Sequence, residues 1–153
     1  MYSEASKRYY RPKIAPKFWN NLADRSQTGL IGSINEVRDE IDPRNKFLTR
    51  WADNDFTQWE STDNIDTLDR YRELIEWSAT HTRFNARAKA KFAREGTADA
   101  WLVAHAMVIG CTIVTEVFND EVKRNIPIPN ACKEFGVRCL DTFEMLREVG
   151  ITL

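Results

Sequence analysis

The chain has 153 residues, of which 42% are hydrophobic and 29% charged, and its formal net charge is -1 at pH 7. This length and composition are typical of one globular domain with its own core, which excludes a disordered tail. The longest apolar run, residues 101–114, contains His105 and Gly110 and is shorter than the roughly 20 residues that span a bilayer, so a membrane protein is excluded as well.

The first half of the chain is predicted to form helices separated by short extended pieces. Apolar side chains predict a helix over residues 16–26, with Pro16 in its first turn. Ser33 is expected to cap a second helix, which ends before Pro43. The other elements expected in this half are a helical turn or two over residues 46–52, a short strand over 56–59, and an amphipathic helix that begins at Thr62 or Asp63 and continues through Ile75.

The second half alternates helices with buried strands. A helix begins at Thr97 or Ala98, carries Asp99 in its first turn, and ends at Gly110. The continuous apolar run 111–114 predicts a central strand of a parallel sheet, covered on both faces. The remaining expected elements are a short helix over 131–135, a second buried strand over 137–140, and a last helix from Asp141 to Gly150. This alternation predicts an α/β protein, a three-layer α/β/α sandwich with a mostly parallel sheet.

Basic side chains concentrate in a segment without acids, residues 77–94. Its candidate RNA-binding residues, at spacings of four, four and three, are Arg83, Arg87, Lys91 and Arg94. These spacings place the four side chains on one face of a predicted helix over 83–94. Such a stripe suits a phosphate backbone or an acidic protein surface, and a plain solvated helix face is the alternative.

The chain has no glycine-rich phosphate loop, so nucleotide cofactors are not expected. Its two histidines are not in a setting typical of nucleophilic catalysis. Its three cysteines, an odd number without a Cys-x-x-Cys pair, are interpreted as small core residues in a reducing cytoplasm. Carboxylates remain, because acids that converge from the ends of different elements can bind Mg²⁺ or Mn²⁺ for phosphodiester chemistry. Asp99 and Glu116 occupy such positions, at the edge where strands end and helices begin.

Several motifs resemble those of a subfamily of PIN-domain proteins. They are Asp99-Ala100-Trp101-Leu102-Val103-Ala104-His105-Ala106, Thr112-Ile113-Val114-Thr115, Ile128-Pro129-Asn130-Ala131-Cys132, Phe135-Gly136-Val137-Arg138-Cys139 and Phe143-Glu144-Met145-Leu146-Arg147. The chain is similar to PIN-like proteins encoded beside helix-turn-helix or metallopeptidase-like antitoxins. The resemblance implies a PIN-like fold and a Mg²⁺- or Mn²⁺-dependent endoribonuclease, the toxin of a type II toxin-antitoxin system.

The resemblance also implies a set of site residues. The acid of the family's Val-x-x-Glu helix falls on Glu40, and the acid that opens the Asp-x-x-Leu-x-Ala helix falls on Asp99. Val117 stands at the usual position of the next acid, so Glu116 is the third expected catalytic residue and Asp120 the reserve metal ligand. The family's opening strand, which ends in Asp-x-Asn, is missing, so we expect residues 1–153 to be a single, N-terminally incomplete domain.

The resemblance further implies partners and a location. They are RNA, a cognate antitoxin and a second copy of the chain, in the cytoplasm and away from membranes. The alternative function is a catalytically silent protein that binds an antitoxin or RNA.

Overall fold

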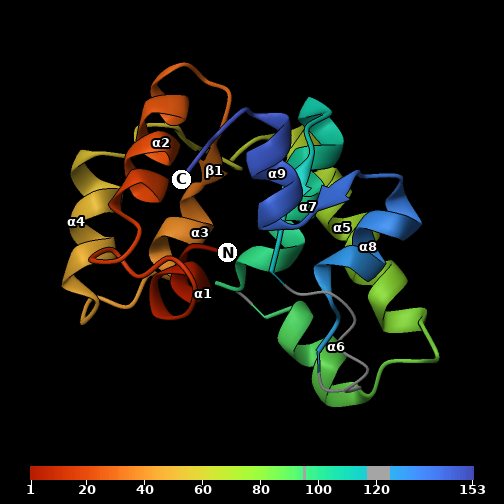
Figure 1. Ribbon diagram of the computed structural model, residues 1–153. Helices are drawn as coiled ribbons and strands as arrows, with labels where there is room; N and C mark the ends of the chain where they lie inside the picture. The colour runs from red at the N-terminus through yellow and green to blue at the C-terminus, as the bar shows by residue number, and fades with distance from the viewer. Residues whose placement is uncertain (95, 117–124) are drawn as a thin grey trace. The chain divides into compact units, whose positions relative to one another are not determined.

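The computed structural model describes residues 1–94, 96–116 and 125–153, and Figure 1 labels its elements. These residues divide into two compact units. The first unit comprises Met1–Glu60 and Thr142–Leu153, and the second unit comprises Ser61–Asp141.

The first unit is mainly helical. It contains α1 (Tyr2–Lys7), α2 (Pro16–Gln27), β1 (Ser33–Ile34), α3 (Asn35–Asp39), α4 (Lys46–Asn54), β2 (Trp59–Glu60) and α9 (Thr142–Glu148). The two short strands pair in parallel, with Ser33 opposite Trp59 and Ile34 opposite Glu60.

Aromatic side chains build the core of the first unit. The Trp19 ring packs edge to face against Phe18 and Trp51, with centroid distances of 5.2 and 5.0 Å. The indole N–H of Trp19 donates to the carbonyl oxygen of Tyr10 at 2.7 Å, and that of Trp51 donates to the carbonyl oxygen of Trp19 at 3.2 Å. Large apolar rings are therefore buried while their polar atoms keep hydrogen-bond partners.

The second unit contains four helices and a second pair of strands. Its elements are α5 (Ile65–Thr80), α6 (Ala86–Phe92), α7 (Ala98–Ile109), β3 (Ile113–Val114), α8 (Ile128–Phe135) and β4 (Cys139–Leu140). The apolar α7 contributes Ala100, Val103 and Ala104 to one buried cluster, which also contains Leu74 of α5 and Cys132 of α8. Small alanine side chains on α7 let the neighbouring helices approach closely, so this unit is organised around a buried helix.

The predicted fold class is wrong. Across the described ranges the strands number four and the helices nine, and the strands form two separate two-stranded parallel sheets. A PIN-like three-layer sandwich with a mostly parallel sheet is therefore not the architecture of this protein. Each apolar run supplies only two ladder residues, and Cys111 and Arg138 near the starts of the runs are exposed. A short apolar run does not distinguish a central strand from a segment packed beneath helices.

The predicted helices exist, with shifted ends. The cap of α5 is Asn64, whose side-chain oxygen accepts the N–H of Thr67 at 2.9 Å, and not Thr62 or Asp63. Helix α8 begins at Ile128 after Pro127, earlier than the expected start. Helix α1 had no clear signal in the sequence. Among the described helices, each is too short or too polar to cross a lipid bilayer.

Candidate functional site

The two strands of the second unit end at one edge, and an acid follows each strand. Val114 pairs with Leu140, and the N–H of Thr115 donates to the carbonyl oxygen of Leu140 at 3.0 Å. Glu116 and Asp141 therefore leave the parallel pair at the same edge, and both are half-buried. In parallel sheets this carboxyl edge is the usual position of functional side chains.

Helix α7 brings Asp99 to the level of this edge. The helix has 12 residues, which rise about 18 Å. The following residues 111–116 contain β3 and cover at most about 20 Å in the return direction. Gly110, at φ 71°, reverses the chain between them in a left-handed conformation that favours glycine. Figure 1 shows the returning segment alongside α7, so Asp99 lies at the same end of the unit as Glu116. We call Asp99, Glu116 and Asp141 the acidic edge.

Asp141 was expected only as the start of the last helix and is not among the predicted site residues. Its position was visible in the sequence, because Asp141 directly follows the second predicted strand and Glu116 comes two residues after the first. The same position also suits an ordinary helix cap, because Asp141 directly precedes α9. The register of β3 and β4 shows that it belongs to the same edge.

The acidic edge is not a ready-made metal centre. Within residues 1–94, 96–116 and 125–153, no three His, Cys, Asp or Glu side chains lie close enough together to hold a metal ion. Asp120 lies outside the described residues. Glu40 belongs to the first unit, where it is exposed at the end of α3. Because each unit is described by itself, a site shared by Glu40 and Asp99 stays a prediction.

The basic segment is shorter as a helix than expected. Asn85 caps α6, since its side-chain oxygen accepts the N–H of Ala88 at 2.9 Å. Arg83 therefore precedes the helix and Arg94 follows it, so only Arg87 and Lys91 keep the helical spacing of four. The prediction of one helical face for all four side chains is wrong, although all four are exposed.

The buried side of α6 orients Arg87. Ala88 and Phe92 belong to the core of the second unit, which leaves Arg87 on the solvent side. In the part of the chain that the structure describes, no carboxylate forms an ion pair with Arg83, Arg87 or Arg94. The Lys91 ammonium instead donates to the side-chain oxygen of Asn125 at 2.7 Å. The segment thus offers guanidinium groups to an anionic partner.

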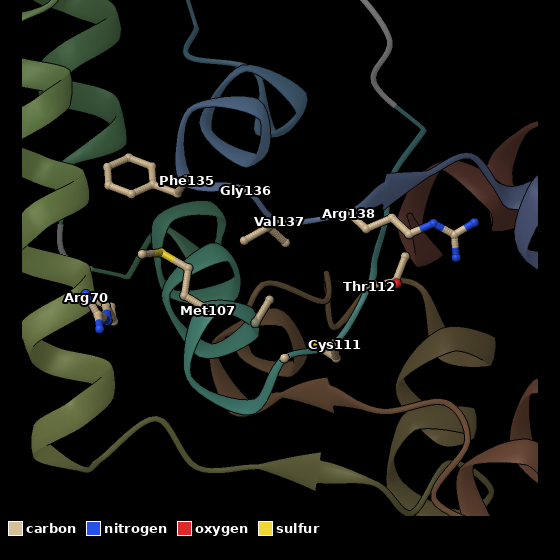
Figure 2. Close-up of a pocket in the computed structure, with 10 residues that line it drawn as sticks. Arg70, Met107, Cys111, Thr112, Phe135, Gly136, Val137 and Arg138 are labelled. Atoms are coloured by element: carbon tan, nitrogen blue, oxygen red, sulfur yellow. The ribbon is translucent and has the colours of Figure 1, made fainter.

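A pocket of about 560 Å³ opens at the opposite edge of the second unit, where β3 and β4 begin. Figure 2 shows Met107, Phe135 and Val137 around it, while the Arg138 side chain extends away from them. Cys111, which was expected to be a core residue, is exposed and lines this pocket. None of the predicted site residues that the structure describes lines it, so the pocket and the acidic edge are separate features.

The comparisons with known proteins give a family and no activity. A family described as a domain of unknown function, DUF4411, matches residues 1–153. No curated protein and no solved structure matches the chain significantly. Because the match extends over the whole sequence, the chain belongs to the DUF4411 family.

Proposed function

We propose that the chain is an endoribonuclease that depends on Mg²⁺ or Mn²⁺ and acts as the toxin of a type II toxin-antitoxin system. One observation carries the proposal. The second unit combines half-buried carboxylates at one edge, Asp99 and Glu116, with an exposed basic segment whose arginines lack carboxylate partners in the described residues. RNA cleavage requires both kinds of group. Cations bind the phosphates, and carboxylates can hold a metal ion that stabilises negative charge where the phosphodiester is attacked.

The carboxylates have the chemistry that such an ion prefers. Mg²⁺ and Mn²⁺ take oxygen ligands and retain several waters, so few protein ligands suffice. Asp99 and Glu116 would supply oxygens from the second unit, and the motif resemblance adds Glu40 and Asp120. An ion held by these carboxylates would supply Lewis-acid chemistry, which polarises a phosphodiester oxygen and makes water more acidic.

The basic segment has the chemistry that RNA requires. Arg83 and Arg87 are exposed and can each form two parallel hydrogen bonds to a phosphate. The segment, with Lys91 and Arg94, would hold the RNA strand by charge and without reading its sequence. The toxin part of the proposal is supported by the sequence motifs shared with proteins encoded beside antitoxins, and not by the fold.

The test is cleavage of a labelled single-stranded RNA by the full chain with Mn²⁺, with and without EDTA. We expect cleavage that EDTA abolishes and that Asp99→Asn and Glu116→Gln each reduce at least 100-fold. Asp63→Asn is the matched control. It makes the same chemical change as Asp99→Asn, at an exposed residue beside the start of α5. Full metal-dependent cleavage by Asp99→Asn would refute the assignment of the site. RNA binding that is indifferent to EDTA, without cleavage, would instead support the catalytically silent alternative.

The toxin assignment is tested separately in cells. Induced expression of the chain should stop growth, and the Asp99→Asn variant should not. Co-expression of the protein encoded beside the gene should restore growth and form a complex that can be purified. Equal growth inhibition by the chain and by Asp99→Asn would contradict a toxic effect that depends on cleavage.

A further inference from the structure

The segment that joins α1 to α2 in the first unit is strongly basic (Figure 1). Residues 7–17, which we call the N-terminal basic segment, contain five cationic side chains and no acidic one. All five are exposed, namely Lys7, Arg8, Arg11, Lys13 and Lys17. Arg8 pairs with Glu4 at 2.9 Å, and no carboxylate that the structure describes forms an ion pair with the other four. Ion pairs therefore leave most of this positive charge available to an anionic partner.

Tyr9 projects from this segment into solvent. The exposed fraction of its side chain is 70%, whereas that of the next residue, Tyr10, is 5%. An aromatic side chain left in water does not gain the free energy that its burial would supply. The Tyr9 ring is therefore available to a partner that presents a flat apolar surface.

The neighbouring Tyr10 anchors the segment in the core of the first unit. Its ring stacks on that of Phe18, with a centroid distance of 4.0 Å and an interplanar angle of 10°. Its carbonyl oxygen accepts the indole N–H of Trp19 at 2.7 Å. Phe18 and Trp19 are 0% and 1% exposed, so the anchor is deeply buried. Tyr9 is thus presented next to a fixed point of the backbone.

A turn holds the rest of the segment. The N–H groups of Ile14 and Ala15 both donate to the carbonyl oxygen of Arg11, at 2.8 and 2.9 Å. The Nε–H of Arg11 donates to the carbonyl oxygen of Lys7 at 3.1 Å, which connects the turn to the end of α1. A surface that is already ordered loses less conformational entropy when it binds a partner.

The chemistry of the segment fits single-stranded RNA better than a lipid surface. Proteins that bind single strands without sequence preference combine cations that contact the backbone with aromatic rings on which bases stack. A helix that binds a membrane surface needs an apolar face that enters the lipid. The apolar side chains of α1, Tyr2 and Ala5, are instead buried in the first unit, at 6% and 2% exposed. Ile14, although exposed, belongs to the turn and to no such face.

We propose that the N-terminal basic segment is a binding surface for single-stranded RNA, on which a base stacks against the Tyr9 ring and the cations contact phosphates. The inference rests on the proposed function for the choice of RNA, and it adds a contact surface in the first unit that does not require cleavage. Every base has a π-face, so stacking on Tyr9 tolerates any sequence. The exposed ammonium groups of Lys13 and Lys17 supply phosphate contacts.

The first test measures the affinity of the full chain for a labelled single-stranded RNA by fluorescence anisotropy, without divalent ions. Tyr9→Ala should weaken binding about fivefold or more, because the stacking of a base on an aromatic ring contributes at least that factor. Tyr9→Phe should stay within about twofold of the parent, since it retains the ring. Leu30→Ala, which shortens another exposed apolar side chain of the first unit, is the control and should bind as the parent does.

The second test examines the charges of the segment in the same assay. Lys13→Gln with Lys17→Gln should lower the slope of log affinity against log salt concentration by about 1.4, because each phosphate contact contributes about 0.7. Lys46→Gln with Arg50→Gln is the matched control, since it removes two exposed cations from α4 in the same unit. The slope should change less in this control, and an equal decrease in both pairs would overturn the assignment of phosphate contacts to the segment.

Photochemical crosslinking of a thiouridine-labelled RNA should attach the RNA to the peptide that contains Tyr9, as mapped by mass spectrometry. The proposal is overturned if the parent binds no RNA, if folded Tyr9→Ala binds with the affinity of the parent, or if Tyr9→Phe or Leu30→Ala loses as much. Association with phosphatidylserine vesicles that depends on Tyr9, with unchanged RNA affinity, would overturn it in favour of a lipid surface. Because no divalent ion is present, a chain without ribonuclease activity can still support the inference, and an active ribonuclease can refute it.

Discussion

Replacing Arg83 and Arg87 together with glutamine should weaken RNA binding and reduce its salt dependence. Each cationic group that contacts a phosphate of single-stranded RNA contributes about 0.7 to the slope of log affinity against log salt concentration. Loss of two contacts should therefore lower the slope by about 1.4. Over a fourfold rise in salt concentration, the affinity of the variant should fall roughly sevenfold less than that of the parent.

The structure selects these two arginines from the basic segment. Both are exposed, and neither forms an ion pair with any carboxylate that the structure describes. Lys91 is a poorer choice because its ammonium is already hydrogen-bonded to Asn125. Since the two arginine side chains are outside the core, the substitutions should change the free energy of unfolding by no more than about 0.5 kcal/mol.

Fluorescence anisotropy of a labelled single-stranded RNA, titrated without divalent ions at several salt concentrations, measures the slope. The matched control is Arg70→Gln with Arg72→Gln, which removes the same charge from the same unit. These two guanidinium groups already pair with Glu73 and Asp69, at 3.0 and 3.3 Å. An unchanged slope in Arg83→Gln with Arg87→Gln would refute the interface and leave a solvated face. An equal decrease in the control would show that only net charge matters.

Three further predictions concern stability and titration. Trp19→Ala should lower the free energy of unfolding by about 3 to 5 kcal/mol, because the ring is 1% exposed and its removal leaves a large cavity. Urea denaturation measures this change, and a loss below about 1 kcal/mol would contradict the central place of Trp19 in the core of the first unit. Asn64→Ala should cost about 1 kcal/mol in the same assay, since the side chain caps the N–H of Thr67, and Asn64→Asp should retain most of the stability. The hydrogen bond from the Arg44 guanidinium lowers the pKa of the Asp42 carboxyl in the folded chain. This hydrogen bond therefore stabilises the fold above the pKa that Asp42 has in the unfolded chain, and the stabilisation is lost as the pH falls through the pKa of Asp42 in the folded chain. Carboxyl NMR titration should show that pKa rising in Arg44→Gln, and an unchanged value would refute the pairing.

Local signals in the sequence determined most helices of this protein. Apolar periodicity and Pro16 predicted α2, which the structure confirms over Pro16–Gln27. Glycine predicted the ends of α7 and α8, and Gly110 and Gly136 both adopt the left-handed conformation there. These signals succeed because caps and helical faces depend on residues within a few positions of one another. The same reasoning failed for the start of α6. The helix begins after its cap, Asn85, and therefore does not include Arg83.

The sequence could also indicate Asp99 and Glu116 as candidates, because their positions depend on local signals. Asp99 lies in the first turn of a helix, and Glu116 comes shortly after the end of a strand. Only the tertiary structure decided how far the strands extend, that β3 pairs with β4 alone among the described strands, and that Asp141 belongs to the same edge. It also decided that the Cys132 thiol is buried while the Cys111 thiol faces solvent. Sheet pairing and side-chain burial depend on segments that are distant in the sequence. An apolar run by itself does not indicate which of these segments packs against it.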